Sequence, residues 1–156
     1  MKIGFTGTRR GMTQAQLEVV RRILGAQDRY CELHHGDCIG ADDQADEIAI
    51  EFDMYVIVHP PVSDALRACC FWKRGRERIN HIERGPKPYH ERNRAIVDET
   101  DFLIAAPASL ATGGGTWYTI NYALEVGKNV YAVMPDGTEW DNELLESHFI
   151  SKGVTK

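Results

Sequence analysis

Short apolar runs alternate along the 156-residue chain with stretches in which apolar residues recur at helical spacing. The apolar runs predict strands at 2–6, 30–35, 54–58, 102–106 and 129–134. The helical spacing predicts helices at 13–25, 41–52, 90–100, 116–126 and 141–150. This alternation indicates a single α/β domain over residues 1–156, a three-layer sandwich with a mainly parallel sheet of about five strands.

One segment interrupts the alternation. Four prolines, Pro60, Pro61, Pro86 and Pro88, bound an irregular excursion at about 60–89, in which we expect one short helix. Nine of the 18 lysines and arginines lie between positions 67 and 94. These nine are Arg67, Lys73, Arg74, Arg76, Arg78, Arg84, Lys87, Arg92 and Arg94. Such a basic patch is typical either of a surface that binds an anionic ligand or of a solvated loop.

Three glycine-rich turns, at 7–11, 36–42 and 113–116, each join a predicted strand to a predicted helix. In a parallel sheet such turns emerge at the carboxyl ends of the strands. We therefore expect them to line one crevice with free backbone amides and helix N-termini, an arrangement that binds phosphate.

Each turn also has a simpler interpretation. The first turn is neither a GxGxxG motif nor a P-loop, so Arg9 and Arg10 either clamp a phosphate or lie in solvent. In the second turn, Asp42 or Asp43 either accepts a ribose hydroxyl or caps a helix. In the third, three consecutive glycines favour close approach of a ligand. The candidate ligand-binding residues are Gly7, Thr8, Arg9, Arg10, Gly36, Gly40, Ala41, Asp42, Arg92, Gly113, Gly114, Gly115 and Thr116.

The remaining composition narrows the function classes. A net charge of -5 argues against binding of duplex nucleic acid, which needs a basic surface. No apolar run reaches the ~20 residues of a membrane span, and no secretory signal begins the chain, so a cytoplasmic location is expected. The four cysteines have no CxxC spacing. Neighbouring histidines such as His34 and His35 point to opposite faces of a strand, and we expect neither a metal site nor a cofactor.

Several segments resemble a known family. The stretches 90–94 (HERNR), 101–107 (DFLIAAP) and Gly113-x-Gly115-Thr116 are similar to the core of the LOG, or lysine-decarboxylase-like, proteins. Segments 3–9 and 36–42 resemble the wider SLOG superfamily, which includes YspA/YpsA-like proteins, the DNA-processing protein DprA and sensors of nucleotide-derived signals. The resemblance implies a Rossmann-like fold, phosphate on the glycine turns and assembly into dimers or larger homo-oligomers.

The resemblance also implies a reaction. LOG enzymes hydrolyse the N-glycosidic bond of nucleoside 5′-monophosphates, and by position Arg92 matches their catalytic arginine. Their lysine is Asn93 here, and their glutamate falls at Thr119. A hydroxyl does not replace a carboxylate in such a reaction, which argues against LOG-type hydrolysis.

Three functions remain. The first is binding, or sensing, of a nucleotide or nucleotide-derived ligand such as a nucleoside phosphate or ADP-ribose, with Trp117, Tyr118 or Trp72 stacking on a base. The second is an N-ribosidase that recruits a carboxylate from elsewhere. Candidates for that carboxylate are Asp42, Glu91 and Glu125. The third is DprA-like binding of single-stranded DNA through the basic patch.

Overall fold

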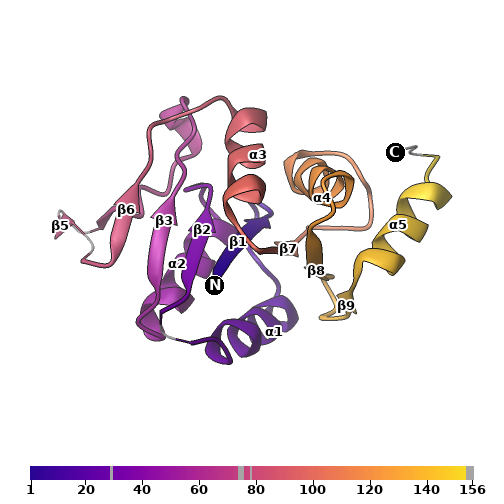
Figure 1. Ribbon diagram of the computed structural model, residues 1–156, viewed down its shortest axis with the longest axis horizontal. Coiled ribbons are helices and arrows are strands. Elements are labelled where there is room, and N and C mark those ends of the chain that lie inside the picture. The colour runs from indigo at the N-terminus through magenta and orange to yellow at the C-terminus, as the bar shows by residue number, and fades with distance from the viewer. Residues whose placement is uncertain (29, 74–75, 78, 154–156) are drawn as a thin grey trace.

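The computed structural model describes residues 1–28, 30–73, 76–77 and 79–153 (Figure 1). Within the basic excursion, Arg74 and Arg78 lie outside the described residues, as do the side chains of Lys73 and Arg76.

The centre of the molecule is a seven-stranded sheet with the strand order β6-β3-β2-β1-β7-β8-β9. Its strands are β1 (Lys2–Gly7), β2 (Glu32–His35), β3 (Tyr55–Val58), β6 (His81–Glu83), β7 (Phe102–Ala106), β8 (Asn129–Val133) and β9 (Glu139–Trp140). All neighbouring pairs are parallel except β8 and β9. The predicted α/β class and mainly parallel sheet are confirmed.

The predicted number of about five strands is too low for this sheet. All five predicted strands are present, and β6 and β9 extend the sheet at its two edges. These strands have three and two residues, too few for an apolar periodicity to show in the sequence. The excursion is also more regular than expected. It holds a 3-10 turn (Asp64–Leu66) and a hairpin of β4 (Trp72–Lys73) and β5 (Arg76–Glu77) before β6.

Helices cover both faces of the sheet (Figure 1). They are α1 (Gln14–Gly25), α2 (Ala41–Glu51), α3 (Tyr89–Glu99), α4 (Gly115–Glu125) and α5 (Asn142–Ser151). Helix α1 begins with a capping box, in which Thr13 and Gln16 satisfy each other's backbone amides. None of the described helices is long and apolar enough to cross a membrane.

The alternation of side chains along the strands builds two cores. Ile3 and Phe5 of β1 pack with α1 and α2 on one face, whereas Leu103 and Ala105 of β7 pack with α3, α4 and α5 on the other. This arrangement is the predicted three-layer sandwich.

The chain order places a crevice at one edge of the sheet. From β1 the chain builds β2, β3 and β6 outward in one direction, then returns to place β7 and β8 on the other side of β1. The loops that follow β1 and β7 therefore leave the same edge of the sheet in divergent directions, and the gap between them is the usual ligand position in open α/β sheets.

Candidate functional site

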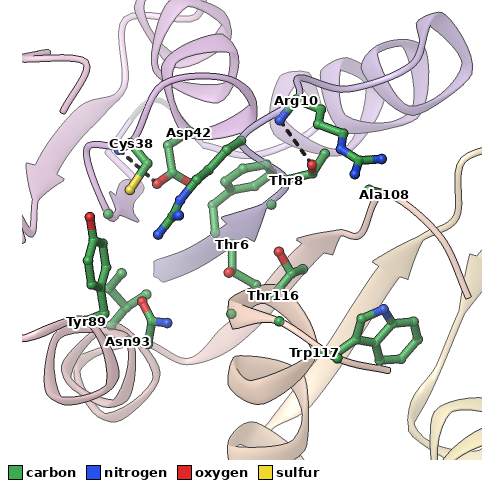
Figure 2. Close-up of a pocket in the computed structure, with 18 of the residues that line it drawn as sticks. Thr6, Thr8, Arg10, Cys38, Asp42, Tyr89, Asn93, Ala108, Thr116 and Trp117 are labelled. Atoms are coloured by element: carbon green, nitrogen blue, oxygen red, sulfur yellow. Dashed lines mark hydrogen bonds between the residues drawn. The ribbon is translucent and has the colours of Figure 1, made fainter. Parts of the chain in front are cut away.

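A pocket of about 460 Å³ lies at the carboxyl ends of β1, β2 and β7. Its lining comes from β1, from the loops after β1, β2 and β7, and from the N-terminal parts of α2, α3 and α4. Figure 2 shows that side chains from these separate segments gather around one space. The volume is within the range of small-molecule sites, about 300–1,000 Å³.

All three glycine-rich turns reach this pocket, and most predicted ligand-binding residues line it. Those in the lining are Gly7, Thr8, Arg9, Arg10, Gly36, Asp42, Arg92, Gly113, Gly114, Gly115 and Thr116. Gly40 and Ala41 are not among the lining residues, although their turn is.

The second turn differs from the expectation in its hydrogen bonds. The amide of Cys38 donates to Asp42 Oδ2 at 3.2 Å, and the amide of Ala41 donates to the carbonyl of Thr8 at 2.9 Å. Gly40 has a φ of +89°, and a Cβ there would lie 2.3 Å from the carbonyl oxygen of Arg9. The expected offer of a free amide from Ala41 is therefore wrong. Gly40 is glycine because two loops of the protein pack closely there.

The first turn is also largely satisfied by the protein itself. Its amides at Thr8, Arg10 and Gly11 all donate to acceptors within the chain. A Cβ on Gly7 would lie 2.5 Å from the Cβ of Ala41. The glycines of the first two turns thus allow the turns to pack against each other.

The third turn behaves differently. A Cβ built on Gly113 or Gly114 would meet no atom within 4 Å, and Gly114 has a φ of +91°. Helix α4 begins at Gly115 without a side-chain cap and without an acidic residue in its first turn. The first amides of a helix lack intrahelical partners and carry the positive end of its dipole. Here that end faces the pocket over open space, as an anion site requires.

Two arginines bring positive charge to the mouth of the pocket. Arg9 and Arg10 are exposed, and among the described residues neither forms an ion pair with a carboxylate. The guanidinium of Arg9 lies 5.0 Å from the ring centre of Tyr89, on which the Arg92 guanidinium also packs, at 5.4 Å. Tyr89 lines the pocket and was not predicted from sequence, because it follows Pro88 in a stretch without periodicity.

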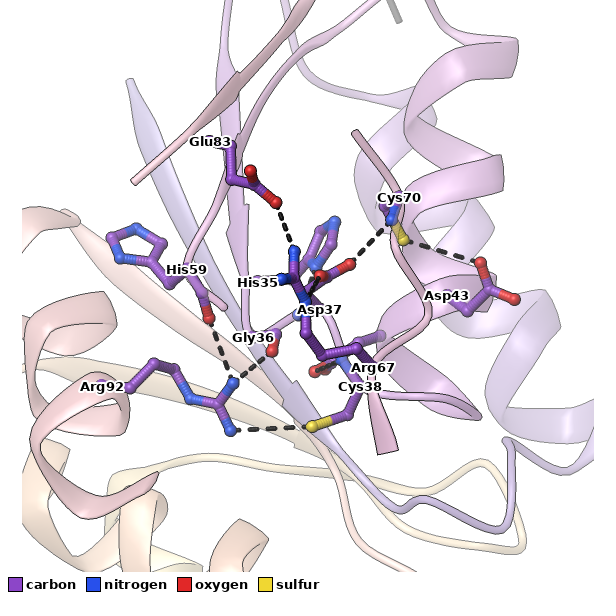
Figure 3. A network of polar contacts seen from close by, with 11 residues as sticks. His35, Gly36, Asp37, Cys38, Asp43, His59, Arg67, Cys70, Glu83 and Arg92 are labelled. Atoms are coloured by element: carbon purple, nitrogen blue, oxygen red, sulfur yellow. Dashed lines mark hydrogen bonds and ion pairs between the residues drawn. The ribbon is translucent and has the colours of Figure 1, made fainter. Parts of the chain in front are cut away.

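Arg92 is buried in the pocket wall, with an exposed fraction of 5%. Its Nη1 donates to the carbonyls of Gly36 and His59, the latter at 3.1 Å (Figure 3). Its Nη2 approaches Cys38 Sγ at 3.7 Å, and its Nε donates to Asn93 Oδ1 at 2.7 Å. The guanidinium therefore ties α3 to the ends of β2 and β3.

The Arg92–Asn93 bond also orients the Asn93 amide. Because Oδ1 accepts from Arg92, Nδ2 is left for the other side, and a Cβ on Gly115 would lie 3.9 Å from it. A neutral donor of hydrogen bonds thus lies beside the third turn, at the position where the resemblance places a lysine.

Asp42 is the carboxylate among the described lining residues. It is 6% exposed, and burial raises the pKa of its carboxyl against the opposing charges of His35 and Arg92. The other carboxylates considered for a reaction, Glu91 and Glu125, are exposed and lie outside the lining. Thr119 is buried, and its hydroxyl donates to the Gly115 carbonyl within α4.

The aromatic residues expected to stack on a base have other contacts. Trp117 lines the pocket but is 2% exposed, with its ring against Phe149 and its Nε1 donating to the Ser109 carbonyl. Tyr118 stacks on His90 at 4.0 Å. Trp72 is half exposed on the hairpin and does not line the pocket.

Ion pairs neutralise two of the described arginines of the basic patch. Arg67 pairs with Asp37 and Glu83 (Figure 3), and Arg84 pairs with Glu99. The patch is therefore less positive than its sequence suggests.

A buried network on the α2 face joins two histidines to one carboxylate. His35 Nε2 and His81 Nε2 each lie 2.8 Å from Asp46 Oδ1. Burial disfavours the charged forms of His35 and Asp46, but the attraction between the two side chains outweighs it. This attraction raises the pKa of His35 and holds the pKa of Asp46 well below its usual range.

Comparison with solved structures confirms the fold. DNA processing protein A from Helicobacter pylori, whose structure describes a single-stranded DNA binding mode, matches with a TM-score of 0.64 and 19% identity over 100% of this chain and 74% of that one. The molybdenum cofactor carrier protein from Chlamydomonas reinhardtii matches with a TM-score of 0.56 and 20% identity, over 84% and 74%. The structural genomics target TM1055 matches with a TM-score of 0.56 and 15% identity, over 83% and 71%.

The chain shares its Rossmann-like α/β fold with these three proteins. At these identities the likeness concerns the fold. No family model matches the sequence. No curated protein matches it significantly either. The Rossmann-like fold that the resemblance implied is thus confirmed over the whole chain.

Proposed function

We propose that the protein binds, and in this way senses, a nucleotide or nucleotide-derived ligand in the pocket at the carboxyl ends of β1, β2 and β7. The observation that carries the proposal is the third turn. Gly113 and Gly114 face open space in front of the uncapped N-terminus of α4. A phosphate there accepts hydrogen bonds from the amides of Gly115 and Thr116.

The charges around the turn favour an anion. Arg9 and Arg10 bind the phosphate from the first turn, and the Asn93 amide donates to it from α3. Arg92 adds positive charge from the wall and keeps the loops in place. Opposite these three arginines, the described lining carries one carboxylate, Asp42, which accepts a ribose hydroxyl.

A ligand panel tests this function. We expect AMP, CMP, ribose 5-phosphate or ADP-ribose to raise the melting temperature, whereas adenosine and cytidine without phosphate leave it unchanged. A ligand that binds at 100 times its Kd stabilises the fold by about 2.7 kcal/mol, or roughly 5–11 °C at this size. If no phosphate compound shifts the melting temperature at millimolar concentration, the proposal is wrong.

A second candidate function is hydrolysis of the N-glycosidic bond, and Asp42 is the observation that favours it. It is buried in the pocket wall with a raised pKa, as catalytic acids often are. Incubation with AMP, CMP and NAD followed by chromatography for free base tests this activity. Asp42→Asn is expected to abolish any release of base.

Binding of single-stranded DNA is the third candidate function, and a binding assay with a short oligonucleotide at increasing salt concentration tests it. Two described arginines of the basic patch, Arg67 and Arg84, are paired with carboxylates, so we expect a short oligonucleotide to bind weakly and to be released by moderate salt. Tight binding that survives salt and depends on Arg67 would instead favour this function.

We further propose that the protein works in the cytoplasm as a homo-oligomer. The four cysteines form no disulfide in the part of the chain that the structure describes, which supports a reducing compartment. Light scattering on the purified chain measures its oligomeric state, and a monomer at micromolar concentration contradicts the proposed assembly.

A further inference from the structure

A second polar cluster lies on the α3 face of the sheet, outside the pocket. His34 on β2, His59 just after β3 and Glu99 in the last turn of α3 meet there. His34 Nδ1 and His59 Nε2 are 3.0 Å apart, and Glu99 Oε2 lies 3.7 Å from the first and 3.8 Å from the second. Three donor atoms from distant parts of the chain thus form a small triangle.

The size of this triangle fits a metal ion. Zinc binds imidazole nitrogen and carboxylate oxygen at about 2.0–2.2 Å, so two ligands of a tetrahedral centre are about 3.4 Å apart. The three observed separations lie on both sides of that value. A hydrogen bond between the two imidazoles accounts for the shortest of them, but it does not account for the carboxylate beside both rings.

The surroundings prepare the imidazoles as ligands. The other ring nitrogen of His34, Nε2, lies 3.0 Å from Glu32 Oε2, and a proton shared there leaves Nδ1 with a free lone pair. Metal-binding histidines usually have such a carboxylate partner. Both rings are buried, with exposed fractions of 0% and 3%.

We propose that His34, His59 and Glu99 bind one divalent transition-metal ion, best matched by Zn²⁺, with water in the fourth position. The side chain of Glu99 is 37% exposed, which provides access for the ion and the water. The residue types are those of catalytic and regulatory zinc sites, two imidazoles and one carboxylate. This site lies next to the pocket wall. Arg92, which lines the pocket, donates to the carbonyl of His59.

One neighbour opposes the ion. Arg84 Nη2 lies 3.3 Å from Glu99 Oε2, where its charge competes with the metal for the carboxylate. Arg84 is 48% exposed and can move into solvent. Its removal is therefore expected to tighten metal binding, which a purely structural histidine pair would not do.

The test is a titration of the metal-free full-length protein with Zn²⁺ in competition with a chromophoric chelator. We expect one ion per chain for the wild type. Glu99→Gln replaces an anionic ligand by a poor one and is expected to weaken binding at least tenfold. Asp98→Asn is the matched control, since Asp98 is the next residue on α3 but accepts from Tyr122 instead, and it should bind within twofold of wild type. Arg84→Gln should bind several-fold more tightly.

Cobalt provides a readout on the unaltered chain. Co²⁺ in a tetrahedral site of nitrogen and oxygen ligands absorbs visible light strongly, and excess Zn²⁺ should remove this band. The proposal is overturned if the wild type binds no ion at micromolar Zn²⁺ and gives no such band. It is also overturned if Glu99→Gln binds as tightly as Asp98→Asn, which would indicate surface histidines. No nucleotide takes part, so this result is separate from that of the ligand panel.

Discussion

The proposed position of the phosphate predicts that one substitution will stabilise the free protein and strongly weaken ligand binding. Gly115 is the first residue of α4, exposed and lining the pocket. A Cβ there would touch only Asn93 Nδ2, at 3.9 Å, an ordinary contact. Both alanine and glutamate therefore fit the backbone.

The expected gain in stability has two parts. Replacing glycine at a compatible position contributes about 0.4–1 kcal/mol. A carboxylate in the first turn of a helix adds about 0.3–1 kcal/mol through the helix dipole. Gly115→Ala should thus raise the free energy of unfolding slightly and Gly115→Glu by about 1–2 kcal/mol, or roughly 2–8 °C in melting temperature.

The effect on binding has the opposite sign. Two like charges 4 Å apart repel by about 4 kcal/mol at an effective dielectric constant of 20. We therefore expect Gly115→Glu to weaken phosphate-ligand binding at least 100-fold, which corresponds to about 2.7 kcal/mol. Gly115→Ala adds no charge and should lose less than tenfold.

Urea unfolding and calorimetric titration with the best ligand of the panel measure the two effects. The matched control is Gly85→Glu, because Gly85 also has open space around its Cβ position but lies outside the pocket. The reasoning is refuted if Gly115→Glu binds the ligand as well as Gly85→Glu, or if it destabilises the free protein.

Three further predictions concern the arginines of the pocket and the buried His35–Asp46 pair. Arg92→Ala leaves two buried carbonyls without their donor and should cost about 2 kcal/mol in urea unfolding even without ligand, and an unchanged midpoint contradicts this. Arg9→Ala combined with Arg10→Ala should weaken ligand binding tenfold or more and flatten its salt dependence in titrations, while stability stays constant. The raised pKa of His35 stabilises the fold below its unfolded value of 6.5 and loses that effect as the pH rises, whereas the lowered pKa of Asp46 stabilises it above 3.8 and loses that effect as the pH falls. Unfolding between about pH 6 and pH 9 should show the alkaline loss, and Asp46→Asn should remove it.

Much of the fold was predictable because its signals are local. A short apolar run indicates a strand buried on both faces, and apolar residues at helical spacing indicate a helix with one buried face. Five strands and five helices can therefore be predicted from residues close together in the sequence. The capping box at Thr13 is similarly local. Strands β6 and β9 were not predictable, because two or three residues carry no period and their pairing depends on distant strands.

The site was predictable only in part. Sequence alone placed three glycine-rich turns at one edge of the sheet, and the structure has them there. It did not distinguish a glycine that accommodates another loop, such as Gly40, from one that faces open space, such as Gly113. It also did not indicate the contacts of Tyr89, because nothing in its neighbourhood repeats.

The sequence by itself determined the layers of this protein, the edge at which its turns emerge and the run of three glycines that leads into α4. The tertiary structure alone decided which backbone amides remain free, that Arg92 is buried and tied to two carbonyls, and that His34 and His59 meet Glu99. The physical reason is the separation along the chain of the residues that interact. Periodicity and turn chemistry act between residues a few positions apart, whereas the pairing of amides, charges and ligand atoms depends on which distant segments the packed core brings within a few ångströms.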